Sequence, residues 1–248
     1  MPRLGVAASV ELLPEYAGGL LHLEKHSHVW VLAWLDRAER DVLQVTPRGV
    51  LDQGPQGLHG VFAVRSPVRP NPIGLTATRI VGIQGLSIAV DPLDFLNGTP
   101  VIDLKPYFVS RDLIFTANNT QIGRPASAEM MRESLLRQAV NFHGELCVNL
   151  ALAVRILEHF RSGILRMMEP AGWKVTAPLG RPCLIDAMMG MTRVSPGRGS
   201  LGFTQHDRVR IEHNGEIYTY ELRPAAASAE QTLESPGEEL FRVTPRQS

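Results

Sequence analysis

The sequence predicts an all-β barrel domain followed by a smaller α+β domain. In the first part of the chain, short β-branched and apolar segments are separated at short intervals by Gly, Pro and Asp, a spacing typical of small barrels. After about Thr116, apolar residues recur at helical spacing instead. A strong hairpin signal, Asn214-Gly215, then lies between two segments that alternate with period two.

Domain boundaries follow from these changes of pattern in a chain of 248 residues. A chain of this length can bury two modest cores. The region between the two patterns is rich in Asn, Gly and Pro, and the C-terminal end is rich in Ala, Ser, Glu and Pro. We expect the barrel in residues 1–112, a linker in 113–128, the α+β domain in 129–224 and a mobile tail in 225–248.

Composition limits the partners. Lys+Arg and Asp+Glu number 25 each, so no global charge attracts nucleic acid or membrane, and any RNA contact must use a local patch. Two cysteines provide no disulfide framework, the N-terminus lacks the pattern of a signal peptide, and no apolar run approaches membrane-spanning length. We therefore expect a cytoplasmic protein that does not enter a membrane. Candidate RNA-contacting arginines are Arg37, Arg40, Arg48, Arg193 and Arg198, although solvated surface is the commoner role for such residues.

The strands of the first domain are read from their apolar and β-branched residues. Pro14 to Lys25 reads as a turn and short helix. No strand is followed by a glycine-rich loop and a helix, so a Rossmann-type cofactor site is not supported. The expected strands are 9–13, 28–35, 41–46, 58–64, 75–82 and 86–92.

The stretch RSPVRPNPIG, residues 65–74, is the most distinctive in this domain. Its three prolines exclude a helix and stiffen an extended loop. Arg65 and Arg69 can hold an anion, Gly74 permits close backbone approach, and the loop carbonyls are expected to remain free as acceptors. The alternative is a rigid connecting loop with solvated arginines.

A second motif, DFLNGTPVIDLKPY, covers residues 94–107. Asn97-Gly98 predicts a tight turn, and Pro106 ends the regular structure. In an extended segment Asp103, Lys105 and Tyr107 share one face. An ordinary surface salt bridge is the alternative interpretation.

These motifs, with PEYAGGL at residues 14–20 and Ser27-His28, resemble the TrmO/TsaA family. The resemblance covers roughly residues 1 to 110. It implies a small β-barrel methyltransferase, usually dimeric, that uses S-adenosylmethionine. The implied reaction is methylation of N6 of threonylcarbamoyladenosine beside the anticodon of certain tRNAs. Relatives carry a strand and loop before the equivalent of Pro2-Arg3, so we expect either residues upstream or a covered sheet edge.

The resemblance also implies roles for individual residues. Asp103 or Tyr107 would take a proton from the acceptor nitrogen, with Lys105 beside them in the catalytic group. Asn97 stands where the family usually has aspartate, which removes one negative charge near the pocket. The implied cofactor-binding residues are Arg65, Arg69, Pro70, Asn71, Pro72, Gly74, Asp94, Gly98, Thr99 and Pro100.

The second half begins with a predicted helix that Ser127 caps. A further helix is expected from Cys147 to Phe160, with Gly163 stopping it. Residues 209–213 and 216–222 form the expected hairpin.

His143 and Cys147 are four residues apart, and Cys183 and Asp186 are three apart. Each pair can lie on one side of a helical turn, so the side chains can converge on a metal ion, of which zinc is the simplest choice. The alternative is that both cysteines are buried apolar side chains and that His143 caps a helix.

The segments HGELC, CLIDA, GMT and GRGSL resemble the FmdE family, in this order. The resemblance spans roughly residues 135 to 222 and implies a mixed α/β fold and metal binding through His143, Cys147 and Cys183. The family pattern is changed at Glu145, Val148, Asn149, Met191 and Arg198.

Three functions remain open from the sequence. The leading hypothesis is a tRNA methyltransferase that uses S-adenosylmethionine, binds tRNA and forms a homodimer, with zinc or another divalent metal in the second domain. The second is a methyltransferase that acts on a small, metal-binding molecule. The third is a non-catalytic protein that binds the cofactor and a metal.

Overall fold

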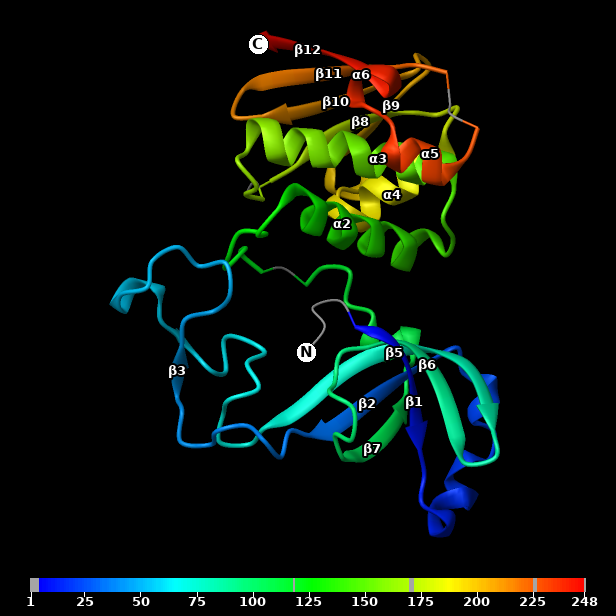
Figure 1. The fold of residues 1–248 in the computed structure, drawn as a ribbon. Coiled ribbons are helices and arrows are strands. Elements are labelled where there is room, and N and C mark those ends of the chain that lie inside the picture. Colours follow the sequence, from blue (N-terminus) through cyan, green and yellow to red (C-terminus); the bar gives the residue numbers. More distant parts are fainter. Residues whose placement is uncertain (1–4, 118, 170–171, 225–226, 248) are drawn as a thin grey trace. The chain divides into compact units, whose positions relative to one another are not determined.

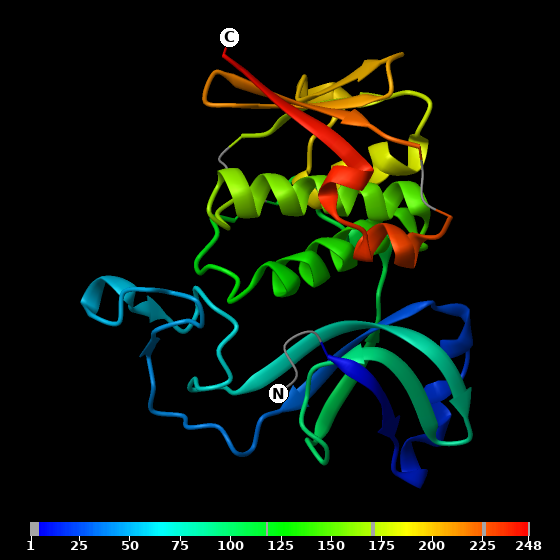
Figure 2. The ribbon, with the colours of Figure 1, turned by 45° about the horizontal axis from the view of Figure 1, so that its top comes forward.

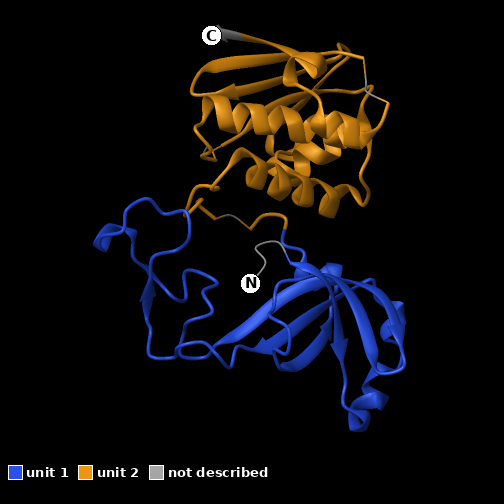
Figure 3. Cartoon of the chain, in the orientation of Figure 1, with its two compact units in different colours: residues 1–114 blue, residues 115–248 orange. Residues whose placement is uncertain are grey.

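The computed structural model describes residues 5–117, 119–169, 172–224 and 227–247. The chain divides into two compact units, residues 1–114 and 115–248 (Figure 3). The boundary falls inside the predicted linker 113–128. No helix in the described ranges has both the length and the apolar character needed to cross a membrane.

The first unit is built on a five-stranded antiparallel sheet of order β1-β6-β5-β2-β7 (Figure 1). Among the described residues, the outer strands β1 and β7 each pair with one neighbour, so the all-β character is as predicted but the sheet does not close into a barrel. The strands are β1 (Val6–Glu11), β2 (His28–Trp34), β5 (Ile73–Gln84), β6 (Ser87–Leu93) and β7 (Val101–Pro106).

The segment between β2 and β5 does not extend the main sheet. The expected strands 41–46 and 58–64 shrink to a two-residue ladder, β3 (Gln44–Val45) and β4 (His59–Gly60), which forms a separate sheet. Prolines and glycines between them break the backbone into turns and a short 3-10 helix, Pro55–Gly57. The segment therefore leaves the main sheet as an arm instead of extending it (Figure 2).

Alternation along β2 determines the two faces of the sheet. Val29, Val31 and Ala33 are fully buried in the core, whereas His28 and Trp30 point to the other face. Two short 3-10 helices, Pro14–Leu20 and Leu23–Lys25, supply Leu20 and Leu23 to the same core and agree with the expected turn and short helix. The unit ends in the short helix α1 (Val109–Asp112).

The second unit packs helices against one face of a five-stranded sheet (Figures 1 and 2). The sheet has the order β12-β11-β10-β8-β9, and only β8 and β9 run parallel. The long helices are α2 (Ala128–His143), α3 (Val148–His159) and α4 (Pro182–Thr192). The strands are β8 (Lys174–Pro178), β9 (Leu201–Thr204), β10 (Arg208–His213), β11 (Glu216–Leu222) and β12 (Phe241–Gln247).

Two local signals in this unit, the cap at Ser127 and the hairpin turn, act as predicted, whereas Gly163 does not stop its helix. The amide of Met130 donates to Ser127 Oγ at 3.1 Å, which caps α2. β10 and β11 form the expected hairpin, with positive φ at Asn214 and Gly215 in the turn. α3 continues into one π-helical turn, Phe160–Ile164, so Gly163 lies within the last turn of the helix.

The predicted mobile tail differs from the structure over its described part. Residues 227–247 form α5 (Ala229–Glu234), α6 (Gly237–Leu240) and β12. Leu240 and Phe241 are buried, and β12 pairs with the whole length of β11. The sequence did not predict this structure for two reasons. The segment has few apolar residues among many polar ones, and its strand forms only by pairing with β11, which is distant from it in the sequence.

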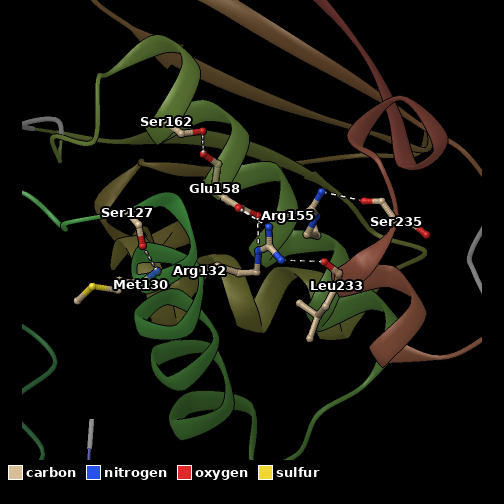
Figure 4. Close-up of polar contacts among 8 residues, drawn as sticks. All are labelled: Ser127, Met130, Arg132, Arg155, Glu158, Ser162, Leu233 and Ser235. Carbon is tan, nitrogen blue, oxygen red and sulfur yellow. Dashed lines mark hydrogen bonds and ion pairs between the residues drawn. The ribbon is translucent and has the colours of Figure 1, made fainter. Parts of the chain in front are cut away.

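Buried ion pairs tie the C-terminal segment to the helices (Figure 4). Glu158 on α3 accepts hydrogen bonds from Arg132 on α2 at 2.7 and 2.9 Å and from Arg155 at 2.9 Å. The two arginines also donate to the carbonyl oxygens of Leu233, at 3.2 Å, and Ser235, at 2.8 Å. Each arginine thus joins a buried carboxylate to the backbone of the C-terminal segment.

Candidate functional site

The end of β2 holds both sequence motifs of the first unit. The amide of Trp34 donates to the carbonyl oxygen of Pro100 at 2.8 Å, and the amide of Leu35 donates to that of Pro72 at 2.8 Å. Two consecutive amides at the end of β2 therefore bind the proline loop and the segment that follows the Asn97-Gly98 turn. Two segments far apart in the sequence meet at this strand end.

A cavity of about 220 Å³ lies where these segments meet. Asp36 and Arg37 bring one charge of each sign to its wall, and Gly98 and Thr99 are the cofactor residues predicted from the sequence that reach it. The lining residues are Leu35, Asp36, Arg37, Ala38, Pro67, Val68, Leu96, Asn97, Gly98 and Thr99.

The turn in the second motif has the predicted geometry. Gly98 has φ of +79°, which favours glycine, and the amide of Thr99 donates to the carbonyl oxygen of Leu96 at 3.1 Å. Asn97 lies at the tip of this turn, in the cavity wall. Residues 35–38 were not predicted as part of the site. Their only signal is their position directly after a buried strand.

The proline loop uses more of its polar groups internally than the sequence suggested. The carbonyl oxygen of Pro70 accepts from Arg40 Nε at 3.2 Å, and that of Asn71 accepts from the amide of Ile73 at 2.8 Å. Together with Pro72, these are three acceptors that were expected to be free. The expectation failed because donors come both from the loop itself, at Ile73, and from the segment that follows β2, at Leu35 and Arg40.

The arginines of the proline loop do not line the cavity. Arg69 Nη2 donates to the carbonyl oxygen of Val61 at 2.6 Å, and its guanidinium lies 5.8 Å from the centre of the Phe62 ring. Arg65 is exposed. Arg69 thus anchors the arm that contains β4, while Arg37 is the arginine that reaches the cavity.

Gly74 and Asp94 have packing roles. A Cβ atom on Gly74 would lie 2.5 Å from Cε1 of Phe95, so any larger residue at this position would force the ring to shift. The Asp94 carboxylate accepts a hydrogen bond from the Thr76 hydroxyl, which joins the end of β6 to β5. Both residues fix the start of the second motif against the sheet.

Asp103, Lys105 and Tyr107 lie along one face of β7 and its continuation. Lys105 Nζ lies 2.6 Å from Asp103 Oδ2, and the Tyr107 ring centre lies 5.6 Å from that of Trp30 on β2. Burial and the nearby Arg79 lower the pKa of His28, on the same face. Asp103, Lys105 and Tyr107 are not among the residues that line the cavity.

In the second unit, three predicted metal ligands converge. One ligand atom each of His143, Cys147 and Cys183 lies within 4.8 Å of the others, and Cys147 Sγ is 3.8 Å from His143 Nε2. The other ring nitrogen of His143, Nδ1, lies 3.0 Å from Asp186 Oδ2. Burial and the adjacent Cys147 raise the pKa of the Cys183 thiol.

Helix ends create this convergence. His143 is the last residue of α2, Cys147 directly precedes α3, and Cys183 lies in the first turn of α4. Gly144, with φ of +101°, turns the chain between the first two. A Cβ on Gly190 would lie 2.6 Å from Cβ of Phe142, so this glycine allows α2 and α4 to approach closely.

Comparison with known proteins identifies the first unit. The family model of the tRNA-methyltransferase O N-terminal domain matches residues 3–113. An S-adenosyl-L-methionine-binding protein of Archaeoglobus fulgidus is 40% identical over 117 residues, which are 46% of this chain and 81% of the relative. The chain belongs to the tRNA-methyltransferase O family.

The chain is also similar to other proteins that are named for S-adenosylmethionine or for TrmO. A probable S-adenosyl-L-methionine-binding protein of Archaeoglobus fulgidus is 42% identical over 198 residues, 77% of this chain and 52% of the relative, so the chain spans about half its length. A putative S-adenosylmethionine-dependent methyltransferase, RcsF of Pseudomonas aeruginosa, is 34% identical over 152 residues, 59% of this chain and 63% of the relative. The crystal structure of TrmO from Pseudomonas aeruginosa aligns at 22% identity with a TM-score of 0.38, covering 96% of this chain and 83% of that one.

Proposed function

We propose that the first unit is an S-adenosylmethionine-dependent methyltransferase. The observation that carries the proposal is the cavity at the end of β2, where two motifs of the tRNA-methyltransferase O family meet. Names of relatives that refer to S-adenosylmethionine support the same cofactor.

The residues of the cavity fit the polar groups of this cofactor. Arg37 would pair with its carboxylate, the carboxylate of Asp36 suits a sulfonium, and the turn at Gly98 offers backbone atoms to the adenine. The volume of about 220 Å³ is below the range of about 300–1,000 Å³ that is common for ligand pockets. The cavity therefore fits part of the cofactor, and the exposed Arg65 is available at the neighbouring loop.

The proposed acceptor is N6 of threonylcarbamoyladenosine next to a tRNA anticodon. When bound, the cofactor supplies a methyl group to this nitrogen by in-line displacement. Asp103 or Tyr107 would take the N6 proton, directly or through water, and Lys105 would hold the Asp103 carboxylate in place. Family membership supports this acceptor.

The sheet face around β7 is the surface on which we propose that RNA binds, because the chain as a whole has no net charge to attract it. Trp30 and Tyr107 offer aromatic rings for stacking, and the exposed cations Arg79 and Lys105 lie on the same face, each beside a carboxylate. Several of the arginines considered from the sequence are engaged internally: Arg40 with Pro70, Arg193 with Ala117, and Arg198 with Arg193. We therefore place the proposed tRNA contact on the β7 face, which also implies a cytoplasmic enzyme.

A homodimer is part of the proposal. The arm between β2 and β5 exposes large apolar side chains, among them Leu43 at 64%, Leu51 at 73% and Phe62 at 84%. Several large exposed apolar side chains in one segment are the kind of surface that a partner subunit can cover. A second copy packed on this arm would bury it and enlarge the small cavity beside the proline loop.

For the second unit we propose an FmdE-like domain that binds zinc or another divalent metal. His143, Cys147 and Cys183 provide one nitrogen and two sulfur ligands, the donor types that zinc prefers. The hydrogen bond from His143 to Asp186 supports a fixed ring orientation.

Isothermal titration calorimetry with S-adenosylmethionine tests the cofactor proposal on the full chain. We expect saturable binding at one site per chain. An intact protein that binds no cofactor would remove the methyltransferase proposal. Binding that is unchanged in Arg37→Ala would remove only the proposed role of Arg37.

A further inference from the structure

The metal site proposed for the second unit has three protein ligands, and their geometry indicates how the fourth position is used. In a tetrahedral zinc site, Zn–N and Zn–S bonds of about 2.0–2.1 and 2.3 Å place nitrogen and sulfur ligands about 3.6 Å apart. Cys147 Sγ and His143 Nε2 are 3.8 Å apart. The pair is therefore already close to the spacing that an ion requires.

Asp186 belongs outside the ligand set. Its carboxylate accepts from Nδ1 of His143, so the proton is held on that nitrogen and Nε2 presents its lone pair toward Cys147. A carboxylate in this position fixes the tautomer and raises the basicity of a metal-binding histidine. Asp186 is thus a positioning residue for the metal site.

Within the described chain, no fourth His, Cys, Asp or Glu joins this group. Structural zinc sites use four protein ligands, whereas sites with three protein ligands keep a position for water or another exchangeable donor. All three ligand residues are only partly buried, so solvent can reach the ion. Resting on the proposed metal binding, we propose that the fourth coordination position of this site is open and takes a small neutral donor, such as an imidazole nitrogen, in exchange for water.

Charge selects the class of donor. Two thiolates cancel the charge of a divalent ion, and the carboxylate of Asp186 adds a negative charge behind His143. An anion entering the fourth position would meet no net positive charge. A neutral nitrogen donor avoids this repulsion and is a good ligand for zinc.

The open position is held by rigid elements. The three ligands come from the ends of α2, α3 and α4, which pack on one another around buried residues such as Met131, Leu150 and Leu184. Ligands on packed helix ends keep their geometry without a fourth protein ligand.

Cobalt substitution tests this inference on the full chain. We expect one Co²⁺ per chain, with strong visible absorption from tetrahedral thiolate coordination. Imidazole should then shift the visible bands along a saturable curve, with the cobalt content unchanged, while azide at the same concentration should cause no shift. Glu145→Gln is the control, because Glu145 lies in the same turn but outside the ligand group and should respond like the parent protein.

Three results would contradict the inference, and each concerns a different part of it: the metal site, the open position or the charge of the donor. Failure to bind cobalt or zinc would remove the metal site itself. If one cobalt is bound and no added donor shifts its visible bands, the site is closed by a fourth protein ligand. A response to azide at lower concentration than to imidazole would overturn the charge argument. None of these results bears on methyl transfer by the first unit.

Discussion

The backbone amide of Leu35 donates to the carbonyl oxygen of Pro72 at 2.8 Å, and the amide of the preceding residue, Trp34, donates to that of Pro100 at the same distance. These two hydrogen bonds attach both motif loops to one strand end. The width of the cavity between the loops therefore depends on how β2 and β5 pair, since Trp34 lies opposite Ile73. Packing of the sheet should consequently control cofactor binding.

Gly74→Ala tests this dependence. The new Cβ would lie 2.5 Å from Phe95, which must shift, so we expect a loss of about 1–3 kcal/mol in the free energy of unfolding. Calorimetry should also show weaker binding of S-adenosylmethionine, because Phe95 precedes the cavity residue Leu96. Gly82→Ala is the control in the same strand, where no atom lies within 4 Å of the new Cβ. Equal effects of the two variants would contradict the packing argument.

Removing the buried carboxylate at position 158 should destabilise the second unit strongly. Glu158 is 6% exposed and forms ion pairs with both Arg132 and Arg155 (Figure 4). Glu158→Ala leaves both guanidinium groups without their partner, and we expect a loss of about 3–5 kcal/mol in urea unfolding. Glu212→Ala breaks an exposed pair with Lys174 and should cost at most about 1 kcal/mol. A similar loss in both variants would show that the buried network contributes little.

Acid should destabilise the second unit through His159. Burial lowers the pKa of this histidine from its ordinary value of 6.5, Arg155 lowers it further, and Glu158 opposes the shift. Between the lowered pKa and 6.5 the unfolded chain binds more protons than the folded chain, so stability is present above this window and is lost as pH falls through it.

The measurement is the melting temperature between about pH 7.5 and about pH 5. We expect the decrease on acidification to be smaller in His159→Gln than in the parent protein. His28 has its pKa lowered in the same direction, so the comparison between the two proteins, not the parent curve alone, isolates His159. Parallel curves would contradict the assignment.

Asp186→Asn should weaken metal binding without removing a ligand. Loss of the carboxylate on Nδ1 of His143 is expected to lower zinc affinity by about 10–100-fold, measured by competition with a chromophoric chelator. Glu145→Gln, which alters a nearby carboxylate outside the ligand group, should leave the affinity unchanged. Unaltered affinity in Asp186→Asn would mean that Asp186 does not position the histidine.

The sequence predicted those features that depend on neighbouring residues. The turn at Gly98, the cap at Ser127 and the hairpin at Asn214 all follow from local patterns, and the structure contains each of them. The sequence also grouped His143 with Cys147, but for a different reason: helical spacing predicted one shared helical turn, whereas the structure brings them together from the end of α2 and the start of α3.

Features that depend on distant partners were missed. Segments 41–46 and 58–64 have strand-like residues, but barrel closure requires pairing across the whole unit, which no local pattern encodes. β12 was missed because its partner, β11, and its few apolar anchors lie within a polar composition. Residues 35–38 in the cavity wall became visible only when both loops were seen attached to β2.

Transfer of a labelled methyl group from S-adenosylmethionine to tRNA tests the central proposal most directly. Parallel reactions should use total tRNA that carries threonylcarbamoyladenosine and the same tRNA from cells that cannot make it. Asp103→Asn serves as the variant in which proton removal is impaired, with Lys174→Ala, on an exposed pair of the second unit, as its control. We predict label in the modified tRNA alone, and a much lower rate at saturating cofactor in Asp103→Asn. Cofactor binding without label in either tRNA would contradict the proposed function.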